Sequence, residues 1–88
     1  MKDSTQICIT DIGSTTTKAI LICSAGESYT IEGIAHSPTT VEKPYADVKI
    51  GIENSIRELE QKTGRQIMNP GSKSDSLSFT PNTLFLST

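Results

Sequence analysis

The chain has 88 residues, enough for at most one small domain with a thin core. Its residues are 34% hydrophobic and 5% aromatic, without tryptophan. The formal net charge is −2, and positive and negative side chains are mixed along the chain. This balance excludes an electrostatic attraction to nucleic acids or to anionic membranes. No apolar stretch approaches the length of a membrane span and the first residues do not resemble a signal peptide, so we expect a cytoplasmic protein.

Three successive strands are predicted at the start of the chain, at residues 6–12, 17–23 and 28–35. Each range is rich in β-branched and apolar residues. Residues 13–16 have the right length for a tight hairpin loop, and Gly33 is expected to mark a β-bulge. The three strands would form an antiparallel meander.

A helix is predicted over residues 44–64, because Val48, Ile52, Ile56 and Leu59 repeat at helical spacing and form one apolar stripe. The helix would begin at the proline that opens this range and end at the glycine that closes it. The acidic side chains on the other faces are expected to be solvated, and they include Glu53, Glu58 and Glu60.

A fourth strand is predicted at residues 83–87, after a loop at residues 69–76. A strand that follows a helix usually returns parallel to the sheet. The expected fold class is therefore α/β, with a β-β-β meander, one helix and then a parallel strand. One face of the sheet and the edge beside the last strand would stay open, so we expect residues 1–88 to be the N-terminal part of a larger, truncated domain.

Cys8 and Cys23 lack the spacing of a zinc or redox motif. We expect both to be buried and reduced, and to lie near each other if the first two strands pair. His36 and the Ser-Pro-Thr-Thr segment at residues 37–40 are expected to form an exposed loop that leads into the helix.

The loop between the first two strands has the chemistry of a phosphate site. A glycine lets the backbone approach a ligand closely, hydroxyl and N–H groups can surround an anion, and a lysine supplies positive charge. A carboxylate at the end of the first strand can hold hydrated Mg²⁺. The candidate phosphate-binding residues are Gly13, Ser14, Thr15, Thr16 and Lys18, and Asp11 would bind magnesium through water.

The same residues are also typical of a polar hairpin turn, in which Asp11 and the hydroxyl groups bind only the local backbone. A Walker A loop is excluded, because Thr17 stands where that motif needs its second glycine and a strand follows instead of a helix. From the residues alone, the two interpretations stay open.

The order strand, D-x-G-[ST], strand resembles the first phosphate loop of the actin, Hsp70 and sugar-kinase superfamily. The stretch DIGSTTTKA, residues 11–19, is similar to activators of 2-hydroxyacyl-CoA dehydratases and benzoyl-CoA reductases. Residues 37–65 resemble the accessory protein of glutamate mutase, a family called MutL that is unrelated to the mismatch-repair protein. The resemblance covers residues 7 to about 70.

This resemblance implies part of a ribonuclease H-like, actin-like ATPase domain that contacts ATP and Mg²⁺ through the residues named above. It also implies an adenosylcobalamin-dependent mutase as protein partner, which the full-length protein would reactivate by ejecting damaged cobalamin. The family's second phosphate loop and adenosine pocket do not occur in these residues, so we expect no measurable ATP hydrolysis by this chain alone.

Three other functions are compatible with these residues. The chain could be a small non-enzymatic interaction module, in which the open sheet edge pairs with a partner or with a second copy as a homo-oligomer. It could be an activator of a 2-hydroxyacyl-CoA dehydratase, although Cys8 and Cys23 do not match the iron–sulfur ligands of those proteins. A sugar kinase is the weakest of the three, because no sugar-binding residues can be named.

Overall fold

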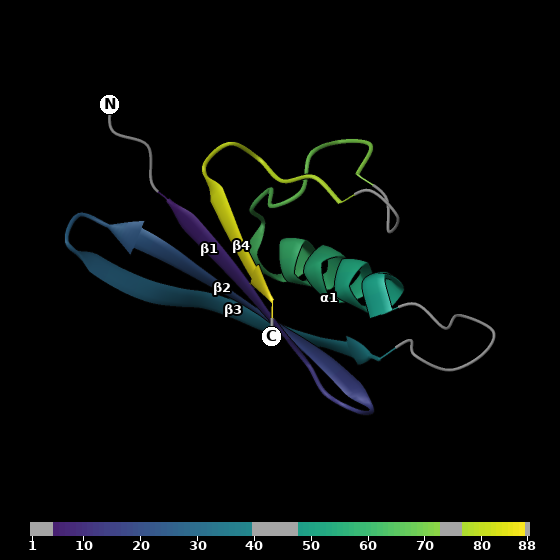
Figure 1. Cartoon of the computed structure of the whole chain (residues 1–88). Helices are drawn as coiled ribbons and strands as arrows, with labels where there is room; N and C mark the ends of the chain where they lie inside the picture. The colour runs from purple at the N-terminus through teal and green to yellow at the C-terminus, as the bar shows by residue number, and fades with distance from the viewer. Residues whose placement is uncertain (1–4, 40–47, 73–76, 88) are drawn as a thin grey trace.

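The computed structural model describes residues 5–39, 48–72 and 77–87. In these residues the chain forms β1 (Gln6–Ile12), β2 (Thr16–Ala25), β3 (Ser28–Pro38), α1 (Val48–Thr63) and β4 (Thr83–Ser87). The strands build one mixed sheet in the order β3-β2-β1-β4, with β1 antiparallel to β2 and parallel to β4. α1 lies against one face of this sheet (Figure 1). The predicted α/β fold, with its meander, helix and returning parallel strand, is confirmed.

β2 and β3 extend beyond their predicted ends. In β3, the ladder with β2 continues through His36 and Ser37 to Pro38. Proline is tolerated there because β3 is an edge strand of the sheet. The predicted loop is therefore wrong for His36, Ser37 and Pro38, and Ser37 is buried instead of exposed. His36 and Pro38 are exposed to solvent, as expected.

A β-bulge lies beside Gly33, as predicted. The pairing of β3 with β2 shifts after Leu21, which leaves Glu32 as the additional residue. Gly33 also lies directly beneath α1, because a Cβ atom at this position would be 2.7 Å from Thr63 Cγ2 and 3.3 Å from Leu59 Cδ1. The glycine thus allows the helix and the sheet to approach closely.

Ile52, Ile56 and Leu59 of the predicted apolar stripe are buried in the core between α1 and the sheet, and the side chain of Val48 lies outside the described part of the chain. Gly64 follows the helix and has a φ of 72°. Its N–H donates a hydrogen bond to the carbonyl oxygen of Glu60 at 2.8 Å, which forms the predicted C-terminal cap. The predicted beginning of the helix at Pro44 lies outside the described residues. No helix in the described ranges is long and apolar enough to cross a membrane.

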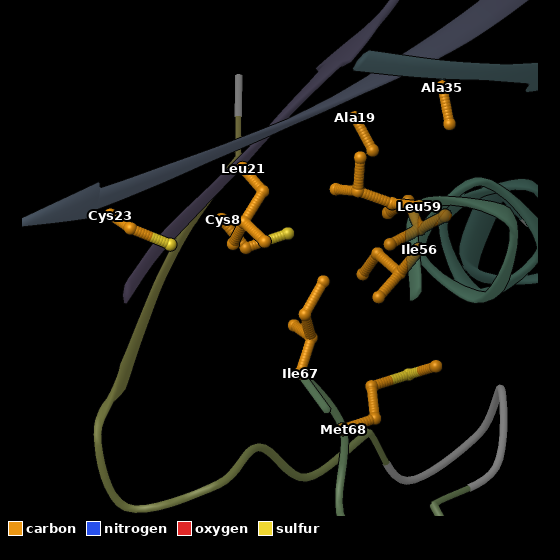
Figure 2. Packing of buried hydrophobic residues seen from close by; sticks show 10 residues of the cluster. Cys8, Ala19, Leu21, Cys23, Ala35, Ile56, Leu59, Ile67 and Met68 are labelled. Atoms are coloured by element: carbon orange, nitrogen blue, oxygen red, sulfur yellow. The ribbon is translucent and has the colours of Figure 1, made fainter. Parts of the chain in front are cut away.

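The core lies between α1 and the sheet (Figure 2). Small side chains dominate its sheet side, so the helix can pack close to the strands. Side chains of the segment that follows α1 also pack into this core. The buried apolar residues on the sheet are Cys8, Ala19, Leu21, Cys23 and Ala35, and the segment after the helix adds Ile67 and Met68.

The opposite face of the sheet is apolar as well, and among the described residues no second helix lies over it. Its side chains form two rows that each cross all four strands. Ile31 is 62% exposed and Leu84 is 52% exposed, so the predicted open face is confirmed for the described residues. One row contains Leu84, Ile7, Ile22 and Ile31, and the other contains Leu86, Ile9, Ile20 and Ile34.

Cys8 and Cys23 are both buried and reduced, as predicted. Cys8 pairs with Leu21 and Cys23 pairs with Gln6, so the two cysteines are diagonal neighbours on the face that α1 covers. Burial, with a smaller contribution from the Glu60 carboxylate, raises the pKa of the Cys8 thiol from 9.0 to about 12. Burial also raises the pKa of Cys23.

We expect the free energy of unfolding to fall as the pH rises above 9, because Cys8 ionises near 9.0 when unfolded and near 12 when folded. In this window the unfolded chain has lost a proton that the folded chain keeps, so stability falls by up to about 1.4 kcal/mol per pH unit. Urea denaturation of the native chain and of Cys8→Ala at about pH 8 and about pH 10.5 measures the effect. The variant should lose less stability between the two conditions, and an equal loss would contradict the assignment to Cys8.

Candidate functional site

The hairpin between β1 and β2 places the candidate phosphate-binding residues at one end of the sheet. The N–H of Gly13 donates to the carbonyl oxygen of Thr16 at 2.9 Å and closes the turn. A Cβ atom on residue 13 would lie 2.9 Å from this same oxygen, so only glycine fits without moving the backbone. Ser14, Thr15 and Thr16 are exposed, which leaves this part of the turn accessible to a ligand.

Asp11 and Lys18 lie directly opposite each other on the two strands that lead into the turn. His36 follows in the same cross-strand row, opposite Lys18 on β3. These three residues alternate along their strands with buried residues such as Thr10 and Thr17, so they lie on the face away from α1. The sequence predicted Asp11 and Lys18 as site residues but not His36, because no local pattern indicates that β3 continues beyond residue 35.

Thr39, the residue after β3, ties the turn to the neighbouring strand. Its hydroxyl group donates to the carbonyl oxygen of Gly13 at 2.8 Å and lies 2.9 Å from the hydroxyl oxygen of Thr17. Its backbone N–H donates to the carbonyl oxygen of Thr15 at 2.9 Å. Sequence reasoning missed this residue, because its partners lie more than 20 positions away along the chain.

Asp11 is the only carboxylate of the β1–β2 hairpin, residues 6–25. In the part of the chain that the structure describes, no group of three histidine, cysteine, aspartate or glutamate side chains could hold a metal ion. A zinc site needs three or four such ligands, whereas Mg²⁺ keeps several waters and needs only one or two carboxylates. The single carboxylate of the hairpin matches the small number of protein ligands that hydrated Mg²⁺ requires.

A concave site, about 420 Å³ in volume, lies at the C-terminal end of α1 and contains no residue of the hairpin. Two arginines in its lining already have partners. Arg57 binds Glu53 at 2.6 Å and the carbonyl oxygen of Ser72 at 2.9 Å, and Arg65 lies 3.7 Å from Glu32. These contacts identify structural roles for both guanidinium groups.

Glu53 and Glu60 do not belong to a solvated helix face, so this prediction was wrong for both. Glu60 Oε2 accepts hydrogen bonds from the backbone N–H groups of Ile67 at 2.8 Å and of Met68 at 2.9 Å. The Glu53 side chain is only 15% exposed in its ion pair with the helix arginine. Glu58 is exposed, as predicted. The difference arises because the segment after α1 folds back along the helix.

The model of the MutL protein family matches residues 7–81, which include the turn between β1 and β2, Thr39 and α1. The chain therefore belongs to this family, the accessory proteins of glutamate mutase, which is distinct from the mismatch-repair protein of the same name. No curated protein matches the chain. Membership of the family implies an accessory role toward glutamate mutase and confirms the resemblance found in residues 37–65.

Proposed function

We propose that this chain provides the ATP-phosphate and magnesium site of an accessory protein that reactivates an adenosylcobalamin-dependent mutase such as glutamate mutase. The observation that carries the proposal is the hairpin. Its glycine-dependent turn exposes three hydroxyl residues, and Asp11 and Lys18 face each other on the adjoining strands. The meander, helix and parallel strand support a ribonuclease H-like, actin-like ATPase domain as the larger setting.

Each part of the hairpin has a defined task in this proposal. Lys18 binds phosphate oxygens as a point charge. Hydroxyl and N–H groups of residues 14–16 donate hydrogen bonds to the same oxygens. Asp11 accepts hydrogen bonds from waters of the magnesium ion, and the ion supplies charge neutralisation for the phosphates. We assign no general base, because the hairpin offers no carboxylate besides Asp11.

In this proposal, the accessory role depends on a domain motion that ATP binding and hydrolysis control. ATP would hold the full-length protein closed, hydrolysis would open it, and the motion would eject damaged cobalamin from the mutase. A single phosphate loop binds nucleotide weakly, because it lacks the second set of contacts that closure supplies. We therefore propose that the 88-residue chain alone binds ATP weakly and leaves it intact.

Titration of the isotope-labelled chain with ATP, followed by NMR, tests the site. We expect magnesium-dependent shifts at residues 11–18, with a dissociation constant on the order of 1 mM. Asp11→Ala should weaken binding of magnesium-ATP at least about tenfold, because it removes the carboxylate that holds the ion.

Glu27→Ala is the matched control, because Glu27 is an exposed carboxylate in the turn at the opposite end of β2. This variant should bind magnesium-ATP like the native chain. A folded spectrum without shifts at residues 11–18 would contradict the proposed site, and so would equal effects of the two substitutions.

A small interaction module is the second function that the structure favours, because the members of the aliphatic rows on β3 and β4 are exposed and β4 is an edge strand. The strand TLFLS carries neither charge nor proline, the usual protections of a free edge. In this alternative the hairpin is inert, and the edge pairs with a partner protein or a second copy. The family match favours an accessory role toward glutamate mutase over a dehydratase activator or a sugar kinase.

A further inference from the structure

We propose that Thr39 is a positioning residue that holds the phosphate-binding turn in its binding conformation. This inference rests on the proposed ATP-phosphate function of the hairpin. Thr39 belongs to the segment at residues 37–40, for which the sequence alone indicated no binding role. The residue touches the turn through both its side chain and its backbone.

Three hydrogen bonds connect Thr39 to different parts of the turn. The Thr39 hydroxyl has a single hydrogen, which it donates to the Gly13 carbonyl oxygen at 2.8 Å. The Thr17 hydroxyl, 2.9 Å away, must therefore donate its own hydrogen to Thr39. Thr17 is fully buried, so this end of the network is anchored in the protein interior. The third bond, from the Thr39 N–H to the Thr15 carbonyl oxygen, ties the far side of the turn to β3 at 2.9 Å.

The bond to Gly13 has a consequence for the phosphate site. A trans peptide points its N–H opposite to its C=O, and both groups lie in one plane. Because Thr39 holds the Gly13 carbonyl toward itself, the N–H of Ser14 points away from Thr39. The same bond keeps the negative carbonyl oxygen engaged, so it does not face an incoming phosphate. Loss of the Thr39 hydroxyl would release this peptide to rotate.

The sharpest test replaces Thr39 with valine, which has nearly the same shape but no hydroxyl. We expect Thr39→Val to weaken magnesium-ATP binding up to about tenfold, the effect of one net hydrogen bond. Thr39→Ser keeps the hydroxyl and should bind within about twofold of the native chain. Thr30→Val makes the same chemical change at an exposed position of β3 and should leave binding unchanged.

A measurement without nucleotide separates this inference from the proposed function. In the ligand-free chain, Thr39→Val should shift the amide signals of Ser14 and Thr15 and speed their hydrogen exchange, whereas Thr39→Ser and Thr30→Val should not. Unchanged amide signals in Thr39→Val would overturn the positioning role. If the native chain binds no ATP, the proposed function fails, while these amide signals still decide whether Thr39 fixes the turn.

The titration with magnesium-ATP is a second test. If the native chain and Thr39→Val bind magnesium-ATP with equal affinity, the inference is also overturned, even if the turn moves. Should the valine variant fail to fold, Thr39→Ala removes the same hydroxyl without the second methyl group, and the same expectations apply to it.

Discussion

Glu60→Ala is expected to lower the free energy of unfolding by about 3 kcal/mol, because it leaves two backbone N–H groups without their acceptor. These groups belong to Ile67 and Met68, whose side chains are almost completely buried. The carboxylate therefore holds the segment after α1 in the core, where Met68 also pairs with Phe79. In an 88-residue domain such a loss is a large share of the total stability. Urea denaturation followed by circular dichroism measures it.

Glu60→Gln is the matched control, because the glutamine amide oxygen can still accept these bonds. Its cost should be about 1 kcal/mol, the difference between a charge-assisted and a neutral acceptor. The substitution should also lower the pKa of Cys8, since the Glu60 carboxylate contributes to the raised value. Similar losses for the alanine and glutamine variants would show that the two N–H bonds are not what the residue provides.

Gly33→Ala is expected to destabilise the chain by about 1–2 kcal/mol through overpacking between β3 and α1. The new Cβ atom would lie 2.7 Å from Thr63 Cγ2, which is too close for any van der Waals contact. The threonine cannot simply turn away, because its hydroxyl group donates to the Leu59 carbonyl oxygen at 2.8 Å. The helix must therefore move off the sheet. The better strand propensity of alanine opposes this effect by only about 0.5–1 kcal/mol, and the expected loss of about 1–2 kcal/mol is the net value.

Thr63→Ser supplies the control for this prediction, because it removes the colliding methyl group and keeps the hydroxyl bond. In the Thr63→Ser background, Gly33→Ala should be close to neutral, so the double-mutant cycle should give a coupling energy of about 1 kcal/mol or more. Additive effects of the two substitutions would mean that the contact with Thr63 does not limit how closely α1 approaches.

The open aliphatic face of the sheet bears on both proposed functions, the phosphate site and the interaction module. Eight isoleucine and leucine side chains form its two rows, and a patch of this kind marks an interaction surface or an aggregation liability. At one end of the face, the rows give way to Asp11, Lys18 and His36. The polar residues of the candidate phosphate site thus lie on the same face as the apolar patch, away from α1.

Local patterns were sufficient to predict the elements. The β-branched runs indicated the strands, the 3.6-residue spacing of Ile52, Ile56 and Leu59 indicated the helix, and Gly64 indicated its end. The residues of the phosphate turn could also be proposed, because glycine, hydroxyl groups, a lysine and a carboxylate lie within eight consecutive positions, residues 11–18.

The sequence by itself thus determined the element order, the helix cap and the chemistry of the turn, since these depend on neighbours in the chain. Only the tertiary structure decided which strand face α1 covers, because Cys8 and its flanking isoleucines are all apolar and both arrangements satisfy the alternation. Likewise, only the tertiary structure assigned Glu60 to the N–H groups of the following segment and Thr39 to the turn. Hydrogen bonds of this kind depend on strand register and chain reversal, which bring together residues that no local pattern connects.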